Sequence, residues 1–185
     1  MRDKVVVGVV GMPGAGKGAF RRVIQRMGYP VVIMGDEVRE EVKRRNLKPT
    51  PENLGKVMLQ LREAEGPVAV AKRCIPKLKN VKEGVVVVDG IRSLHEVKEF
   101  KKHFPNFALI ALHTSPKTRY QRLSQRRRSD DPKDWETFMQ RDLRELSVGL
   151  GAVIATADHT IVNEGTLTQL KRKIQQVLKE VLGDR

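Results

Sequence analysis

The sequence predicts a three-layer α/β fold in which five parallel strands form one sheet covered by helices on both faces. Short apolar runs alternate with segments of helical periodicity, which is the pattern of consecutive strand–helix units. These runs are nearly continuous instead of alternating with polar residues, as expected for strands buried on both faces. A length of 185 residues suits one domain of this class and allows a sizeable core.

Five apolar runs predict the strands, each bounded by glycine, proline or polar residues. The predicted strands cover residues 5–10, 30–34, 85–89, 107–112 and 160–163. Helical patterns fill the segments between the strands and follow the last one. The predicted helices cover residues 19–27, 36–46, 51–65, 68–78, 94–102, 116–128 and 132–148, and a final helix begins at residue 167.

Capping residues indicate where many of these helices begin, because their side-chain oxygens accept hydrogen bonds from free backbone N–H groups. Thr50 is followed by proline, which suits the first position of a helix. Trp135, Phe138 and Met139 are expected to reach the core from the helix of residues 132–148. The expected N-terminal caps are Asp36, Thr50, Ser93, Ser115, Asp131 and Thr166.

Residues 11–18, Gly-Met-Pro-Gly-Ala-Gly-Lys-Gly, join the first predicted strand to the first helix. Gly11, Gly16 and Lys17 match the pattern G-x-x-x-x-G-K of a phosphate-binding loop, and the flanking strand and helix supply its context. Glycines let backbone N–H groups converge on an anion at the positive end of the helix, while the lysine reaches the outer phosphates. The expected ATP-binding residues are Gly11, Met12, Pro13, Gly14, Ala15, Gly16, Lys17, Gly18 and Ala19.

The positions after Lys17 lack the Ser or Thr hydroxyl that usually contacts Mg²⁺ in these loops, because Gly18 and Ala19 stand there. Mg²⁺ therefore needs a carboxylate elsewhere, while nucleotide phosphates and water supply its other oxygen ligands. Asp89 ends a buried strand, where a lone carboxylate is costly unless it is paired or binds a cation. We expect Asp89 to hold Mg²⁺ through water, with capping of the next turn as the alternative.

Charge and composition narrow the class of function. The chain has 36 Lys and Arg against 22 Asp and Glu, a net charge of +14 that favours polyanionic partners such as nucleic acids or phosphorylated metabolites. Cys74 is the single cysteine, so we expect a buried apolar side chain and a reducing compartment. Apolar runs are too short for a membrane span or a signal peptide, which predicts a cytoplasmic protein without a membrane partner.

Charged residues are expected to gather at one edge of the sheet. In an open parallel sheet the ligand crevice lies at the carboxyl ends of the strands. The glycine loop, Asp36 and Asp89 all follow strands at that edge. Residues 35–80 are too long for a simple crossover, and they predict a helical insertion beside the crevice.

Arginines recur on the helix that follows the fourth strand. Arg119, Arg122 and Arg126 stand at positions i, i+3 and i+7, which places them along one helical face. Arginine suits phosphoryl transfer because its planar, permanently charged fork binds phosphate oxygens. We expect Arg122, Arg126 and Arg128 to face an acidic substrate, whereas a solvated basic face is an equal alternative for Arg119 and Arg127.

Four stretches resemble the adenylate-kinase-related nucleotide kinases, and most closely an archaeal family within them. Residues 11–18 have the G-x-P-G-x-G-K-G form of the adenylate kinase loop, in which glycine also replaces the hydroxyl residue. Gly35-Asp36-Glu37-Val38-Arg39 is similar to a G-D-x-x-R segment whose arginine grips the acceptor phosphate. Asp89-Gly90-Ile91-Arg92 resembles a D-G-F-P-R stretch, one residue shorter, that carries a second acceptor arginine. Residues 122–141 resemble the arginine-rich border of the lid.

This resemblance implies a P-loop NTPase fold and transfer from ATP to an AMP-like nucleoside monophosphate, with a short lid region over residues 117–142. The long lid insertion of full-size adenylate kinases is absent, and Ala19 replaces a threonine of those enzymes. The implied catalytic residues are Lys17, Arg92, Arg122 and Arg126, of which Arg122 also contacts ATP. The implied acceptor-binding residues are Gly35, Asp36, Arg39, Gly90, Arg92, Arg128 and Arg141.

Two alternatives remain open. Residues 28–39 also resemble a segment of the dephospho-coenzyme A kinases in which an aspartate acts as base on a ribose hydroxyl. Asp36 would be that base, whereas a phosphate acceptor is already ionised and needs none. The charge of +14 predicts instead a basic, ATP-dependent nucleic-acid-binding or regulatory protein, although an aromatic content of only 4% leaves few surfaces for base stacking.

Overall fold

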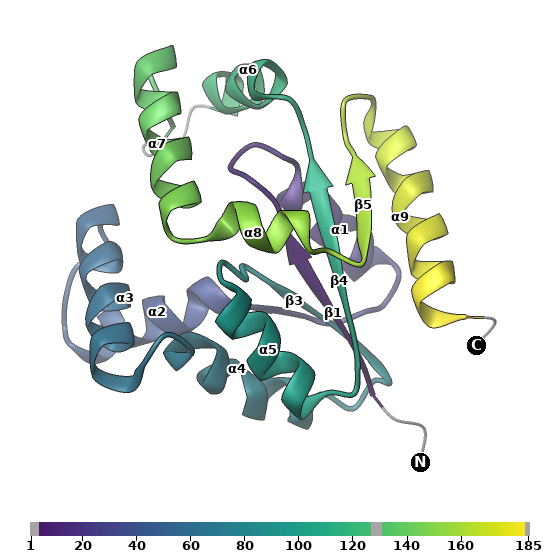
Figure 1. Ribbon diagram of the computed structural model, residues 1–185, viewed down its shortest axis with the longest axis horizontal. Helices are drawn as coiled ribbons and strands as arrows, with labels where there is room; N and C mark the ends of the chain where they lie inside the picture. Colours follow the sequence, from purple (N-terminus) through teal and green to yellow (C-terminus); the bar gives the residue numbers. More distant parts are fainter. Residues whose placement is uncertain (1–3, 127–130, 184–185) are drawn as a thin grey trace.

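The computed structural model describes residues 4–126 and 131–183. Within these ranges, five strands form one all-parallel sheet in the order β2-β3-β1-β4-β5 (Figure 1). The strands are β1 Val5–Val10, β2 Val31–Ile33, β3 Val85–Asp89, β4 Asn106–His113 and β5 His159–Val162. The predicted α/β class and its parallel sheet are confirmed.

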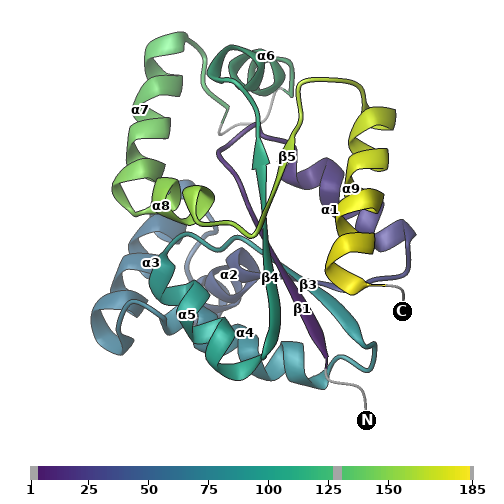
Figure 2. The ribbon, with the colours of Figure 1, turned by 45° about the vertical axis from the view of Figure 1, so that its right-hand side comes forward.

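Helices cover both faces of the sheet. Their bounds are α1 Lys17–Arg26, α2 Met34–Arg44, α3 Pro51–Glu65, α4 Ala69–Asn80, α5 Leu94–His103, α6 Pro116–Arg126, α7 Trp135–Ser147, α8 Leu150–Ala155 and α9 Leu167–Leu182. Helices α1 and α9 pack together on one face, while α4, α5 and α8 lie on the other (Figures 1 and 2). Helices α2 and α3 pack beside α4, and α6 and α7 lie beyond the carboxyl ends of the strands (Figure 2).

The sheet separates two apolar cores, one under each layer of helices. Alternate side chains of β1 point into one core or the other. Val5, Val7 and Val9 face α1 and α9, where they pack with Phe20 and Ile174. The other face of the strand packs against α4, α5 and α8 in the second core. Every residue of β1 is buried, which explains why its run of apolar residues is continuous.

The start of α2 differs from the sequence prediction. Strand β2 ends at Ile33 and the helix begins at once with Met34, without a side-chain cap. Met34 exposes only 2% of its surface, so core packing fixes this start more strongly than a capping preference does. Asp36 therefore lies within the first turn of α2, and its prediction as the N-cap was wrong.

The region after the fourth strand also differs. Asp134, and not Asp131, caps α7 by accepting a hydrogen bond from the Thr137 N–H at 2.7 Å. The predicted helix of residues 132–148 is shorter, and α8 follows it after Gly149, which has a φ of +99°. Phe138 is buried as predicted, but Trp135 and Met139 are 46% and 36% exposed, so their prediction as core residues was wrong.

Candidate active site

A cleft of about 510 Å³ opens at the carboxyl ends of the strands. The glycine loop, the β3–α5 turn and helices α1, α2, α6 and α7 all contribute residues to its walls. It brings together predicted residues that are far apart in the sequence. Those lining it are Gly11, Pro13, Gly14, Gly16, Lys17, Gly18, Ala19, Arg39, Asp89, Gly90, Arg92, Arg122, Arg126 and Arg141.

The other predicted site residues have different positions. Met12 and Ala15 belong to the loop, and Gly35 and Asp36 lie at the start of α2, but these four do not line the cleft. Arg128 lies outside the described residues. The cleft also contains cations and a carboxylate that the sequence did not indicate, namely Arg21, Arg22 and Glu145.

The glycine loop is held in shape by residues that directly follow β4 and β5, at the same edge of the sheet. The carbonyl of Ala15 accepts hydrogen bonds from Thr114 Oγ1 at 3.2 Å and from Asn163 Nδ2 at 2.9 Å. Gly16 has a φ of +108°, and a Cβ there would stand 2.3 Å from Asn163 Nδ2. Only glycine therefore fits this position, for both its backbone conformation and its contact with Asn163.

Lys17 lies at the first position of α1, with its side chain turned back over the loop. Its ammonium donates hydrogen bonds to the carbonyl of Gly11 and, at 3.4 Å, to that of Met12. Desolvation lowers the pKa of Lys17 to about 8, although the negative charges of Asp89 and Glu145 oppose the shift. A bound anion beside Lys17 would raise this pKa and favour the charged ammonium.

Asp89 is buried at the end of β3 with 4% of its surface exposed. Its Oδ2 accepts a hydrogen bond from Arg21 Nη1 at 3.0 Å, whereas Oδ1 is buried and has no hydrogen-bond partner among the described residues. Burial raises the pKa of this carboxyl group, while Lys17 and Arg21 oppose the rise. A buried carboxylate oxygen without a hydrogen-bond partner suits a hydrated divalent cation. Asp89 therefore fits the Mg²⁺ that loops of this kind use.

Across residues 4–126 and 131–183, no cluster of three His, Cys, Asp or Glu side chains could hold a metal ion. Asp89 would therefore share a cation with oxygens of a bound phosphate and with water, as Mg²⁺ sites commonly do.

The turn after β3 presents Arg92 to the cleft. Glu96 is fully buried and fixes this turn, because its Oε2 accepts from the backbone N–H of Arg92 at 2.8 Å and its Oε1 accepts from Arg62 Nη2 at 3.0 Å. Arg92 Nη1 lies 3.9 Å from Glu145 Oε2 on α7. The side chain of Arg92 thus spans the cleft between two walls.

Arg39 enters the cleft from the first turns of α2. Its Nη1 pairs with Asp36 Oδ1 at 2.5 Å, and both side chains are about half exposed. Asp36 thus pairs with a residue that lines the cleft but does not line it itself.

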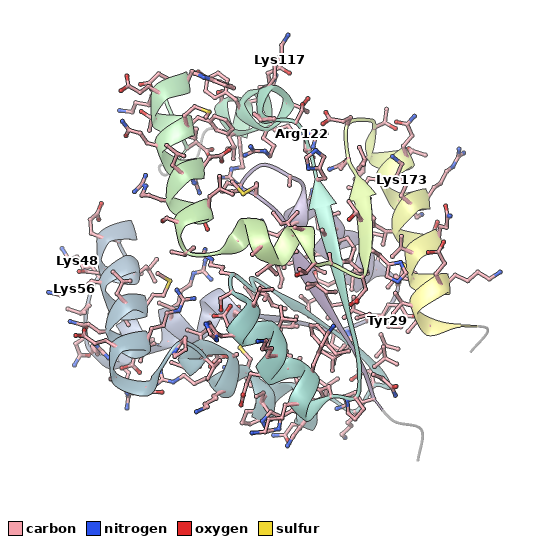
Figure 3. All side chains as sticks on the ribbon, in the orientation of Figure 1. Tyr29, Lys48, Lys56, Lys117, Arg122 and Lys173 are labelled. Carbon is pink, nitrogen blue, oxygen red and sulfur yellow. The ribbon has the colours of Figure 1, made fainter. Side chains whose placement is uncertain are left out.

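The arginines of α6 have distinct roles. Arg122 extends from α6 toward the sheet and donates to Thr114 Oγ1 at 3.4 Å, whereas Lys117 of the same helix points away (Figure 3). Arg126 pairs with Asp131, with Nε 3.1 Å from Oδ1.

Arg119 serves neither of the two roles considered from the sequence. Its guanidinium is buried, forms a two-pronged ion pair with Asp142 on α7, and donates to the carbonyl of Pro13 at 3.1 Å. Its Nε also donates to the carbonyl of Thr114 at 3.1 Å. Arg119 therefore ties the glycine loop to α6 and α7 and is neither a solvated surface residue nor a residue that lines the cleft.

Several of these supporting residues carried no sequence signal. Thr114, Asn163 and Arg21 reach the site across 99, 148 and 68 residues of chain, whereas Glu96 accepts from Arg92, which is four residues away. Only Glu96 had a local indication, since it stands three residues after Ser93 in a capping box.

The strand–loop–helix unit, the parallel sheet and the cationic cleft define a P-loop protein with the architecture of small kinases. A family model described as an AAA domain matches residues 10–139. The chain belongs to the UPF0200 family: it is 47% identical over 182 residues to a UPF0200 protein of Pyrococcus abyssi, covering 96% of this chain and 97% of that one. It is also 50% identical over 183 residues to the UPF0200 protein of Thermococcus sibiricus, covering 97% and 96%.

Solved structures show the same fold at low sequence identity. Shikimate kinase from Acinetobacter baumannii, in complex with shikimate, aligns with a TM-score of 0.59 and 16% identity, covering 98% of this chain and 95% of that one. A gluconokinase from Sinorhizobium meliloti aligns with a TM-score of 0.57 and 16% identity over the same shares. This likeness establishes a P-loop kinase-like fold. None of the helices described here is both long and apolar enough to cross a membrane.

Proposed function

We propose that this protein is an ATP-dependent nucleotide kinase that transfers the γ-phosphoryl group of ATP to an AMP-like nucleoside monophosphate. The observation that carries the proposal is the single cleft that Lys17, Arg39 and Arg92 share. Lys17 belongs to a loop suited to triphosphates, whereas the two arginines come from separate elements on the acceptor side. The cleft thus has the charge and the separate walls needed for two phosphorylated molecules.

The roles of the donor side follow from this placement. Backbone N–H groups of residues 11–18 and the ammonium of Lys17 would hold the phosphates of ATP, with Arg122 and Arg126 over the transferred group. Mg²⁺, when bound, would neutralise developing charge on the phosphates, and Asp89 is the residue that fits it. Transfer has a loose transition state with charge spread over the phosphoryl oxygens, so fixed cations supply most of the catalysis.

The acceptor side belongs to residues 35–80, which we propose as the acceptor-binding insertion, and to the turn of Arg92. Arg39 and Arg92 would bind the monophosphate of the acceptor through charge-assisted hydrogen bonds. Residues 117–142 would act as a short lid. We propose that the whole chain forms one domain with these two specialised regions.

A hydroxyl acceptor is the second candidate, with Asp36 as general base, in line with the resemblance to dephospho-coenzyme A kinases. The structural likeness to shikimate kinase, solved in complex with shikimate, supports a hydroxyl acceptor as this second candidate. Against it, Asp36 pairs with Arg39 and does not line the cleft, and a base must reach the proton that it removes.

A screen of acceptors tests the proposal. The chain is incubated with labelled ATP, Mg²⁺ and either one nucleoside monophosphate at a time or dephospho-coenzyme A, and the labelled product is identified. We expect a labelled nucleoside diphosphate that forms at a much lower rate with Lys17→Ala or Arg92→Ala, while Arg26→Gln, an exposed change on the same helix as Lys17, has no effect.

Two outcomes would contradict the proposal. Normal transfer by both Lys17→Ala and Arg92→Ala would show that the assigned site is wrong. Label that appears only in phosphorylated dephospho-coenzyme A would replace the monophosphate acceptor by the hydroxyl acceptor.

A further inference from the structure

The environment of Gly18 differs from that of a loop with a hydroxyl residue in a specific way. A Cβ built at Gly18 would have Arg21 Nη2 and Arg22 Nη1 as its nearest neighbours, both at 3.9 Å. Two guanidinium groups thus flank the place where other loops carry a metal-contacting hydroxyl. All three residues line the same cleft as Asp89.

One of these guanidinium groups already occupies the carboxylate that fits a metal. Arg21 Nη1 lies 3.0 Å from Asp89 Oδ2, and this is an ion pair between a side chain that is 32% exposed and one that is 5% exposed. The other oxygen, Oδ1, is buried and has no hydrogen-bond partner among the described residues. Asp89 therefore has one oxygen paired with Arg21 and one oxygen that is available to a cation.

We infer that Arg21 and a divalent cation compete for Asp89, so that Arg21 determines how strongly the affinity for nucleotide depends on the metal. This inference rests on the proposed function and deepens it. A single carboxylate neutralises only one positive charge, and a divalent cation placed beside Arg21 would also be repelled by it. Arg21 thus supplies part of the positive charge that Mg²⁺ supplies in loops with a hydroxyl.

The position of Arg21 on α1 makes this role specific. It stands one turn after Lys17, so the helix that presents the lysine to the phosphates also presents the guanidinium to Asp89. Arg26 on the same helix is exposed and does not line the cleft, which makes it a matched control for the loss of one arginine.

The test measures the affinity for ADP by titration calorimetry, once with Mg²⁺ and once with EDTA. The ratio of the two affinities is the coupling between metal and nucleotide, and it requires neither an acceptor nor catalysis. We expect Arg21→Gln to raise this ratio about three- to tenfold, the size of a partly exposed charge-assisted hydrogen bond. Arg26→Gln should leave the ratio unchanged.

A second background shows whether the effect passes through Asp89. In Asp89→Asn the ratio should fall toward one, the value without coupling, and Arg21→Gln added to this variant should raise it no further. A rise that persists without the carboxylate, or a ratio that Arg21→Gln lowers or leaves unchanged, would overturn the competition.

The same measurements separate this inference from the proposed function. An unmodified chain that binds ADP but responds to metal as Arg21→Gln does would overturn only the role of Arg21. A chain that binds no ADP under either condition would overturn both the role of Arg21 and the nucleotide-dependent function.

Discussion

Lys17 is held in surroundings that favour its neutral form. In the free protein its pKa is lowered to about 8, and a bound phosphate would favour the charged ammonium. Nucleotide binding above about pH 8 therefore requires uptake of a proton, and the affinity for ADP should fall by up to tenfold per pH unit there. Titrations with ADP between pH 7 and 9.5 measure this slope.

Lys17→Ala supplies the control for this pH dependence. Because the variant has no ammonium to titrate, its affinity for ADP should be low and nearly constant over the same range. A constant affinity in the unmodified chain would show that Lys17 keeps its charge or does not contact the phosphates.

The pair of Asp36 and Arg39 distinguishes the two acceptor chemistries. Arg39→Ala should raise the KM for the acceptor about tenfold or more, the size of a lost charged hydrogen bond, and leave the KM for ATP unchanged. Asp36→Asn should change kcat by less than tenfold if the carboxylate only orients Arg39. Steady-state kinetics with both substrates varied separates these effects.

The opposite pattern would favour the hydroxyl acceptor. A fall in kcat of about 10²- to 10⁴-fold in Asp36→Asn is typical of a lost general base. Equal losses of affinity for ATP and acceptor in Arg39→Ala would contradict its assignment to the acceptor side.

At the scale of the elements, the buried pair of Arg119 and Asp142 joins α6 to α7. Asp142→Ala would leave the guanidinium of Arg119 buried without its partner, which should destabilise the protein by about 3–5 kcal/mol. Asp134→Ala removes only the exposed N-cap of the same helix and should cost about 1 kcal/mol. Denaturant unfolding of both variants compares the two losses.

Because Arg119 also holds the carbonyl of Pro13, Asp142→Ala should weaken ADP binding in the folded protein. Equal losses of unfolding free energy in Asp142→Ala and Asp134→Ala would show that the buried pair stabilises the fold no more than a surface cap does.

The strands and the glycine loop were predictable because their signals are local. A continuous apolar run identifies β1 wherever it packs, and residues 11–18 carry a complete motif. Since parallel strands end at one edge, the sequence also indicated that the loop and Asp89 would meet there.

The starts of α2 and α7 were not predictable, because competing local signals were decided by packing. Met34 enters the core and begins α2 before Asp36 can cap it. Asp131 precedes a proline as a cap would, yet it pairs with Arg126 while Asp134 caps the helix. In the site, Asn163 and Arg21 depend on contacts across 148 and 68 residues of chain, which no local pattern encodes.

At the scale of the whole molecule, the net charge of +14 supports the alternative of a nucleic-acid-binding protein. Exposed lysines such as Lys48, Lys56 and Lys117 point away from the body of the molecule (Figure 3). We expect weak, sequence-independent binding to duplex DNA that falls by about 10³-fold or more between 50 and 200 mM salt, as for contacts to several phosphates. Fluorescence anisotropy with a labelled duplex measures it.

The cleft and the outer surface should respond differently to substitution. Lys17→Ala should leave duplex binding unchanged while it weakens ADP binding, because surface charge and not the glycine loop attracts the duplex. Tight duplex binding that survives at 200 mM salt and requires ATP would favour the nucleic-acid-binding function over the kinase.

The hydrogen bond from Asn163 to Ala15 has a consequence for biosynthesis. Its partners stand 148 residues apart, so the loop leaves the ribosome long before Asn163 is available to support it. A nascent chain that has not yet released β5 would lack that brace and hold nucleotide poorly. Nucleotide would then stabilise only chains that have released Asn163, and ribosome-stalled chains of increasing length would gain ADP-dependent protease resistance abruptly once Asn163 has emerged.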